Sequence, residues 1–236
     1  MLSDSFIQKY KSKKPPFGGN GLGEFVYLRT YSRWLPEKNR REEWYETVRR
    51  VTDYSIGLYN DEKDHTEEAE ELYDLIFNLK VFPAGRTLWI GGTEAVKKFP
   101  MANYNCSFRV VDDLEAFSEV FYLLMLGCGT GFRILPYDVN KIPHLRSNVK
   151  IIFKNKFVPG NQTVENSTIY PVEYSNKIEI VVGDSKEGWV NALKIYLKAL
   201  SNHTIDEIII NTHYIRPKGA ILKTFGGRAS GPEGLI

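Results

Sequence analysis

The sequence predicts an α/β fold in which a helical N-terminal part precedes alternating strands and helices. Three observations support this prediction. Residues from about 40 to 80 carry apolar side chains at helical spacing. Residues 106–135 show the pattern of a strand, a helix and a second strand. Residues 141–182 hold two β-rich runs separated by a polar stretch, which is typical of a hairpin-type insertion.

Composition and charge exclude several classes of protein. The chain has 236 residues, of which 42% are hydrophobic and 25% charged, and its formal net charge is +2. Because basic and acidic residues are mixed, we expect neither nucleic acid nor a membrane surface as a partner. The sequence has no apolar run of membrane-spanning length and no secretory signal. Two cysteines are too few for a disulfide framework, so we expect a cytoplasmic protein with reduced thiols.

Residues 1–24 are predicted to form a flexible N-terminal arm. The arm is polar and ends in a glycine-rich run from Phe17 to Gly23, which does not favour regular structure. It also holds a cluster of lysines between Lys9 and Lys14. We interpret this cluster as a solvated tail.

A mainly helical cap is predicted over residues 25–98. Trp44, Val48 and Val51 lie at helical spacing in its first helix. A second helix is expected to begin near Asp64, which offers an N-cap. The apolar stripe of this second helix is expected at Leu72, Leu75, Ile76 and Leu79.

A turn is predicted where the helical pattern ends, because Pro83 and Gly85 interrupt it. Arg86 and Thr87 follow directly. A guanidinium beside a hydroxyl could bind a phosphate, but an arginine on a surface turn would give the same pattern. Both interpretations stay open on the residues alone.

A cysteine-containing strand, a helix and a glycine loop follow one another over residues 106–131. The β-prone run from Cys106 to Val111 is predicted to be a buried strand. Residues 114–126 form a helix that is apolar on nearly all sides, so we expect it to be packed on both faces. A loop from Gly127 to Gly131 ends the helix, and its bare backbone permits the close approach of a ligand. Phe132 begins the next predicted strand.

Several familiar site types do not fit this sequence. The 127–131 loop ends a helix instead of opening one, so it is not a dinucleotide fingerprint, and no P-loop is present. The histidines and cysteines lack metal-ligand spacing, so no metal site is predicted. Cys106 has no base nearby in the sequence for acyl transfer. On residue type alone, a buried strand cysteine is more often inert than reactive.

The last fifty residues return to the α/β pattern. A helix is predicted over residues 186–200 and a strand over 208–210, followed by a glycine loop over 225–231. Pro232 and Glu233 then look like the first turn of a further helix.

Six segments of the sequence together resemble the monomeric, adenosylcobalamin-dependent (class II) ribonucleoside-triphosphate reductases. They are Thr30–Lys38, Pro83–Ile90, Asn105–Cys106, the loop at 127–132, Glu187–Trp189 and Phe225–Pro232. No single segment is specific. Their occurrence in the family's order, from about residue 25 to the last residue, is specific.

The resemblance implies a fold and a domain organisation. Residues 99–236 would be the first part of the ten-stranded α/β barrel of ribonucleotide reductases, left incomplete. The β-rich segment at about 141–182 resembles the insertion by which monomeric members form an effector site within one chain. The family's radical-forming cysteine, second redox cysteine, and substrate-side Asn and Glu lie beyond the matched region. The chain thus resembles about the N-terminal third of such an enzyme, and we expect it to be inactive alone.

The resemblance also implies roles for individual residues. Cys106 matches the strand cysteine that helps to reduce the ribose and forms a disulfide, here with a partner beyond residue 236. A rival hypothesis pairs Cys106 with Cys128, although the family usually has a small residue at the latter position. Substrate contacts are implied for Ser107, Cys128, Gly129, Thr130, Arg86 and Thr87. A specificity loop that reports the effector to the substrate base is implied at Phe225, Gly226, Gly227, Arg228, Ala229, Ser230 and Gly231.

The function implied is the conversion of ribonucleoside triphosphates to 2'-deoxyribonucleotides by thiol-dependent radical chemistry, for DNA precursor synthesis. The implied cofactor is adenosylcobalamin, with most of its site outside this chain. The implied partners are a ribonucleotide substrate, a deoxynucleotide effector, the C-terminal remainder of the reductase and a thioredoxin-like reductant. The alternative is a non-catalytic nucleotide-binding or regulatory module derived from such an enzyme.

Overall fold

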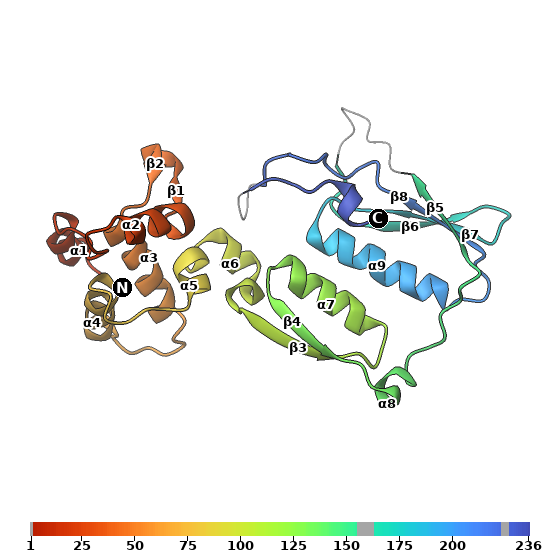
Figure 1. The fold of residues 1–236 in the computed structure, drawn as a ribbon, viewed down its shortest axis with the longest axis horizontal. Coiled ribbons are helices and arrows are strands. Elements are labelled where there is room, and N and C mark those ends of the chain that lie inside the picture. The colour runs from red at the N-terminus through yellow and green to blue at the C-terminus, as the bar shows by residue number, and fades with distance from the viewer. Residues whose placement is uncertain (1, 155–162, 223–226) are drawn as a thin grey trace. The chain divides into compact units, whose positions relative to one another are not determined.

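The computed structural model describes residues 2–154, 163–222 and 227–236. It divides into two compact units, Met1–Tyr104 and Asn105–Ile236, which are described separately below (Figure 1). Both helices and strands occur, which confirms the predicted α/β class. Among the helices of the described part, none has the length and apolar character needed to cross a bilayer.

The first unit is mainly helical. It contains one small antiparallel strand pair, β1 with β2, in which Trp34 lies opposite Arg41. Its elements are α1 (Asp4–Lys11), α2 (Leu22–Val26), the π-helical turn η1 (Tyr27–Tyr31), β1 (Trp34–Leu35), η2 (Pro36–Lys38), β2 (Arg40–Arg41), α3 (Trp44–Ile56), α4 (Thr66–Phe77), α5 (Gly85–Ile90), α6 (Glu94–Lys98) and η3 (Pro100–Asn103).

Helix α1 corrects the prediction of a flexible arm. Ser3 caps the helix by accepting a hydrogen bond from the Phe6 backbone N–H. Phe6 and Tyr10 are buried in the core of the unit, where their rings contact Tyr73 of α4. The Tyr10 hydroxyl donates to Asp74 at 2.7 Å. A short polar sequence therefore forms a docked helix, because its few apolar residues share one face.

Helix α3 follows its predicted pattern closely. It begins with a capping box in which Glu43 and Glu46 each bond the other's backbone N–H. Its predicted apolar positions Trp44, Val48 and Val51 are all buried. The spacing of these residues is therefore that of a core-facing stripe.

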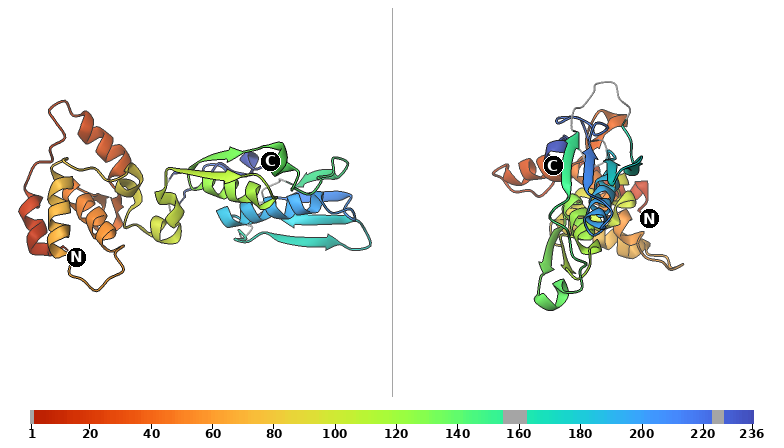
Figure 2. Two further views of the ribbon diagram at one scale, coloured as in Figure 1. Left: turned by 90° about the horizontal axis from the view of Figure 1, so that it is seen from below. Right: turned by 90° about the vertical axis from the view of Figure 1, so that its right-hand side faces the viewer.

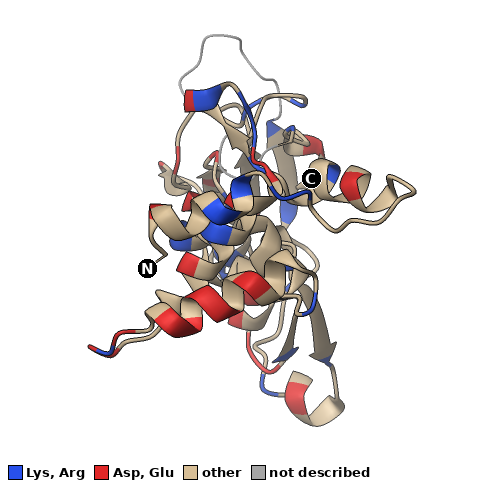
Figure 3. Ribbon diagram, turned by 90° about the vertical axis from the view of Figure 1, so that its left-hand side faces the viewer, with Lys and Arg blue, Asp and Glu red and all other residues tan. Residues whose placement is uncertain are grey.

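Helix α4 packs differently from its prediction. Asp64 stabilises the first turn, because its carboxylate accepts hydrogen bonds from the backbone N–H and the hydroxyl of Thr66. The predicted stripe is only partly right, because Leu72, Leu75 and Leu79 are half-buried. The buried residues are Ala69, Tyr73, Ile76 and Phe77, which turn an aromatic face to the core. The opposite side carries acidic residues exposed to solvent (Figure 3): Glu67, Glu68 and Glu71.

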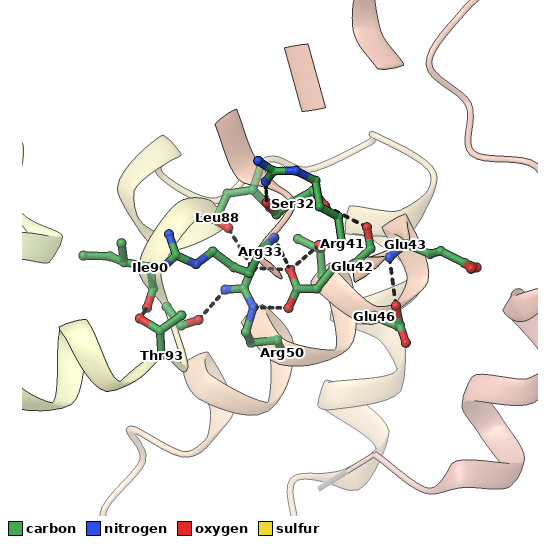
Figure 4. A network of polar contacts seen from close by, with 12 residues as sticks. Ser32, Arg33, Arg41, Glu42, Glu43, Glu46, Arg50, Leu88, Ile90 and Thr93 are labelled. Atoms are coloured by element: carbon green, nitrogen blue, oxygen red, sulfur yellow. Dashed lines mark hydrogen bonds and ion pairs between the residues drawn. The ribbon is translucent and has the colours of Figure 1, made fainter. Parts of the chain in front are cut away.

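A buried ion pair joins α3 to α5. Glu42 is 4% exposed and accepts from Arg50 Nε at 2.7 Å and from the Thr47 hydroxyl at 2.7 Å (Figure 4). Arg50 also donates to the backbone carbonyls of Leu88 and Gly91. A buried carboxylate is tolerated only when it is paired and hydrogen-bonded. Through Arg50 this network fixes the end of α5.

The second unit contains two sheets and two long helices. Its elements are β3 (Cys106–Val110), α7 (Glu115–Met125), β4 (Gly129–Arg133), α8 (Pro136–Val139), β5 (Lys150–Lys154), β6 (Thr168–Val172), β7 (Lys177–Val181), α9 (Lys186–Leu200), β8 (Glu207–Asn211) and the 3-10 turn η4 (Pro232–Gly234). Strands β3 and β4 are parallel. The larger sheet has the order β5-β8-β7-β6, with β6 antiparallel to β7 and the other pairs parallel. In the described part both sheets are small and neither closes into a barrel.

The larger sheet has its core against α9 (Figures 1 and 2). Ile178 and Ile180 of β7 and Ile208 of β8 are buried with Ala192 and Ala199 of α9. The expected hairpin is only partly right. Strands β6 and β7 form a hairpin, but β6 lies in the predicted polar stretch, and the first β-rich run supplies β5, which pairs with β8. The sheet also continues past residue 182 to Asn211. Helix α9 connects β7 to β8, which is the crossover that parallel strands require.

The strand β3 and the helix α7 are less buried than predicted. Cys106 is exposed and Phe108 is 64% exposed on β3, while Phe117 and Leu124 are exposed on α7. The reason is that α7 covers only one face of the β3–β4 pair. Helix α7 also packs along α9, where Lys194 pairs with Glu115 at 2.6 Å, so it contacts neighbours on two sides without being enclosed.

Candidate functional site

The glycine segment after α7 is a strand and not only a loop. Gly127 has a φ of +79°, a conformation that glycine adopts without strain, and it turns the chain after the helix. The Gly129 N–H then donates to the Asn105 carbonyl at 2.8 Å, which begins the pairing of β4 with β3. The predicted strand start at Phe132 is therefore three residues too late, because glycines argue against a strand in sequence patterns.

The register of β3 and β4 places Cys106 directly opposite Gly129 and Phe108 opposite Gly131. Side chains alternate between the two faces of a strand, so these four residues share one face. We call this the open face, because Cys106, Phe108, Gly129 and Gly131 are all exposed.

The open face leaves bare backbone beside the thiol. A Cβ atom added to Gly129 would have one neighbour within 4 Å, the Asn105 carbonyl oxygen at 3.5 Å. A Cβ at Gly131 would meet the Phe108 ring at 3.4 Å. Nothing in the described residues therefore covers the strip of backbone next to Cys106. A ligand could lie against it and reach the sulfur.

The opposite face of β3 and β4 is turned toward α7. Arg109 of this face forms an ion pair with Glu119 of the helix. The Ser107 and Thr130 side chains lie opposite each other, with their hydroxyl oxygens 2.9 Å apart. Cys128 precedes β4 and is 1% exposed. We call this the helix face.

The two thiols lie on different faces of the sheet. Cys106 is opposite Gly129 on the open face, whereas Cys128, one residue before Gly129, is buried on the helix side. A disulfide needs Cβ atoms about 3.5–4.5 Å apart with their vectors converging. A Cys106–Cys128 bridge would therefore need the backbone to move.

Ion pairs brace the far ends of both strands. Arg109 contacts Asp112 and Asp113 as well as Glu119. Its hydrogen bond to Glu119, together with the contacts to Asp113, raises its pKa. Arg133, the last residue of β4, donates two hydrogen bonds of 2.9 and 3.0 Å to the Asp138 carboxylate. These bonds hold the pKa of the Asp138 carboxyl below its usual value. The strand ends are thus tied to the chain that follows them.

Arg86 and Thr87 belong to the first unit. They join α5 to the turn η3, because Arg86 donates to the Ala102 carbonyl and the Thr87 hydroxyl donates to Asn103 at 3.0 Å. These contacts give both residues a structural role. Phosphate binding by them stays a prediction.

The predicted specificity loop folds back on the chain before it. Phe225 and Gly226 lie outside the described residues. Ala229 donates to the Ala220 carbonyl, and its own carbonyl accepts from Gly219 at 2.9 Å. Arg228 donates to the Gly219 carbonyl at 2.9 Å, and the Ser230 hydroxyl donates to the Gly231 carbonyl at 3.2 Å. Gly227 and Gly231 have φ values of +88° and +80°.

The predicted substrate contacts omitted two residues of the open face: Phe108, and Gly131 of the predicted 127–131 loop. Their signal was present, since they lie two residues after Cys106 and Gly129 along paired strands. Recognising it required knowing that the glycine segment is a strand in register with β3.

Two family models match the chain. Residues 2–93 match the ribonucleotide reductase alpha domain, and residues 160–236 match the insertion domain of B12-dependent ribonucleotide reductase. Both descriptions name one class of enzyme. The second model names its B12-dependent branch.

Similar proteins agree with these models. The chain is 33% identical over its whole length to the adenosylcobalamin-dependent ribonucleoside-triphosphate reductases of Lactobacillus delbrueckii subsp. bulgaricus and of Euglena gracilis. It also superimposes on the crystal structure of a B12-dependent (class II) ribonucleotide reductase. That match covers 99% of this chain, with a TM-score of 0.81 and 31% identity.

The chain is therefore similar to the B12-dependent (class II) ribonucleotide reductases. It spans 37% of the length of the Lactobacillus enzyme and 31% of the Euglena enzyme, and 38% of the chain in the crystal structure. The resemblance and the incomplete α/β architecture expected from the sequence are confirmed.

The cofactor that this family indicates is adenosylcobalamin. A pocket of about 490 Å³ lies in the first unit, between α1, α3 and the β1–β2 hairpin. It does not suit the broad apolar faces of a corrin ring, because most of its lining is charged. The charged lining residues are Asp4, Lys11, Glu37, Lys38, Glu42, Glu46, Arg49, Arg50 and Asp53. This pocket therefore does not fit the cofactor.

Proposed function

We propose that the chain is the N-terminal portion of a ribonucleoside-triphosphate reductase and that Cys106 is one of its two reducing thiols. One observation carries the proposal. An exposed thiol stands on the open face beside the uncovered backbone of Gly129 and Gly131. A sugar lying against this glycine strip would have its hydroxyl-bearing carbon within reach of the sulfur.

The chemistry asks for two thiols. Replacing the 2'-hydroxyl of a ribonucleotide by hydrogen takes two electrons and releases water, and two thiols supply these electrons by becoming one disulfide. Cys106 is the first thiol. The second comes from outside this chain, because the sequence holds only two cysteines and Cys128 lies on the helix face. This assignment favours the partner beyond residue 236 over a Cys106–Cys128 pair.

The finer parts of the proposal follow from the same enzyme class. Gly129 contacts the substrate through its backbone, and the loop around Gly227–Gly231 reports a deoxynucleotide effector to the substrate base. A thioredoxin-like protein reduces the disulfide after each turnover. We place the enzyme in the cytoplasm, where thiols stay reduced, and in DNA precursor synthesis. Both cysteines being unpaired supports this compartment.

The test is a chimera in which this chain replaces the matching N-terminal portion of the Lactobacillus delbrueckii reductase. We expect the chimera to reduce ribonucleoside triphosphates with adenosylcobalamin and a dithiol. Cys106→Ser should abolish multiple turnover while nucleotide binding is kept, because a hydroxyl cannot form a disulfide. Cys128→Ala, the matched control, should retain turnover.

Mass spectrometry after one turnover without reductant decides the pairing. A bridge from Cys106 to a cysteine of the Lactobacillus portion supports the assignment. A bridge between Cys106 and Cys128 overturns it. A folded chimera that binds nucleotide but never turns over counts against the reductase function and favours a non-catalytic binding module.

A further inference from the structure

We propose that Ser107 and Thr130 are positioning residues. The hydrogen bond between their hydroxyl groups fixes the register of β3 and β4, and so holds the Cys106 thiol beside Gly129. This inference deepens the function proposed above, and its kinetic part rests on that function. It departs from the expectation that both residues contact the substrate.

The register of β4 is weakly specified by everything else in its first three residues. The strand begins Gly129-Thr130-Gly131, and glycine has no side chain to pack against the neighbouring strand. Glycine-rich strands are prone to slip by a residue for this reason. In the described part of the chain, β4 pairs with β3 alone, so no second strand holds it in place. Thr130 is the one side chain available at this end.

The geometry of Thr130 suits this role. It lies directly opposite Ser107, and the two oxygens are 2.9 Å apart. The Thr130 hydroxyl also lies 3.4 Å from the Cys128 carbonyl, to which it donates. It then accepts from Ser107, so both hydroxyls are used. Threonine is stiff at χ1 because it is β-branched, which limits where its oxygen can point.

Both hydroxyls lie on the helix face. Arg109, two residues after Ser107, pairs with Glu119 of α7, so the side chains of this row point toward the helix. A ligand resting on the open face would be separated from them by the strand backbone. They can influence the thiol only through the position of the strands.

A slip of one residue shows why the register matters. It would exchange the two faces of β4, placing Thr130 on the open face and a glycine under α7. Cys106 would then face a branched side chain in place of bare backbone. The Ser107–Thr130 hydrogen bond thus favours the register in which the open face can receive a ligand over the slipped register in which it cannot.

The first measurement needs no activity. Ser107→Ala, Thr130→Val and the double variant are made in the chimera, and amide hydrogen exchange is followed at Gly129 and Val111, whose N–H groups bond across the pair. We expect each single variant to lose protection about three- to tenfold, since a side-chain hydrogen bond contributes modestly to stability. Thr130→Ser should keep protection. Ser201→Ala, at the end of α9, is the control and should change nothing.

The second measurement separates positioning from substrate binding. In the chimera, Ser107→Ala and Thr130→Val should each lower kcat about three- to tenfold with KM unchanged. The double variant should lose no more than the larger single loss, because both remove one bond. Thr130→Ser should restore kcat.

The outcomes are distinct. Unchanged hydrogen exchange, or a raised KM with normal kcat, overturns the positioning role and returns both residues to substrate contact. Lost protection in the variants, together with an unsubstituted chimera that is folded but inactive, leaves the register assignment intact and contradicts the reductase function.

Discussion

At the scale of single residues, the space beside the Cys106 thiol depends on glycine residues that lack a side chain. Gly129 and Gly131 create the strip beside Cys106 because they lack a Cβ, while Gly127 supplies the positive φ that turns the chain into β4. The same residue type thus serves two purposes within five positions. Substitution by alanine should separate them.

Gly129→Ala is expected to leave the fold intact and to impair activity. Its Cβ would meet one backbone oxygen at 3.5 Å, an ordinary van der Waals contact. The methyl group would nevertheless stand on the open face where we place the substrate. We expect an unfolding midpoint close to that of the unchanged chain, and turnover by the chimera reduced at least tenfold through a raised KM. Unimpaired turnover would contradict the proposal that the substrate lies against Gly129.

The Glu46 carboxylate gives a pH-dependent contribution to stability. Burial alone would raise its pKa, but hydrogen bonds from Arg40 and Lys38 and from the Glu43 backbone outweigh this and lower the pKa to about 2. The contribution is therefore fully present above the ordinary value of 4.5 and is lost as the pH falls toward 2.

The predicted effect of Glu46→Gln follows that sign. At neutral pH we expect the substitution to lower the free energy of unfolding by about 1 kcal/mol, allowing for screening by solvent. The difference from the unchanged chain should shrink between pH 4.5 and 2. Denaturant unfolding at pH 7, 4 and 2.5 measures it, with Glu37→Gln on the neighbouring turn as a charge-matched control. A difference that does not depend on pH would contradict the ion-pair origin.

At the scale of elements, periodicity predicted the helices well and the strand after α7 poorly. Trp44, Val48 and Val51 are buried as their spacing indicates. The first three residues of β4 were predicted to be a loop. Pairing with β3 overrides the low strand preference of Gly129 and Gly131. The role that we propose for Cys106 came from the resemblance, since a sequence does not tell which face of a strand stays open.

The start of α9 explains the Glu187-Gly188-Trp189 motif structurally. Ser185 caps the helix by accepting from the Gly188 N–H, and the Gly188 carbonyl accepts from the buried Ser167 hydroxyl at 2.6 Å. The Ser167 oxygen also accepts from the Gly183 N–H at 2.8 Å. The backbone at Glu165 passes so close that a side chain at Gly188 has no room.

Gly188→Ala is therefore expected to destabilise the second unit. Its Cβ would lie 2.7 Å from the Glu165 carbonyl oxygen and 2.9 Å from the Gly183 Cα, and neither is a flexible side chain. We expect a loss of about 1–3 kcal/mol, as for other overpacked sites. Thermal unfolding compared with Gly129→Ala, the same change at an open position in the same unit, provides the measurement. Equal stability of the two variants would show that the backbone yields here.

At the scale of the whole molecule, apolar side chains are exposed on β3, α7 and β4 and on the residues just after β4. In a closed barrel such residues would be covered by further strands and helices. The exposed residues are Phe108, Phe117, Leu124, Phe132, Ile134, Leu135 and Tyr137. Large exposed apolar patches and unpaired strand edges favour association.

We therefore expect the 236-residue chain to aggregate and to lack reductase activity by itself. Light scattering of the chain alone, and of the chain expressed together with the remaining portion of a relative, tests this expectation. Association with that portion should give a dispersed complex and restore turnover. A stable, monodisperse monomer with cooperative unfolding, or turnover by the chain alone, would contradict it.

The different exposure of the two thiols allows the folded fraction of the protein to be measured by thiol labelling. An exposed thiol and a thiol that is 1% exposed are its only cysteines. A membrane-impermeant thiol reagent should therefore add one label per native chain and two per unfolded chain. The mass difference counts the folded fraction directly, even in a turbid sample where optical methods fail. The strand pair that keeps the sulfurs apart thus makes its own integrity measurable, without any added probe.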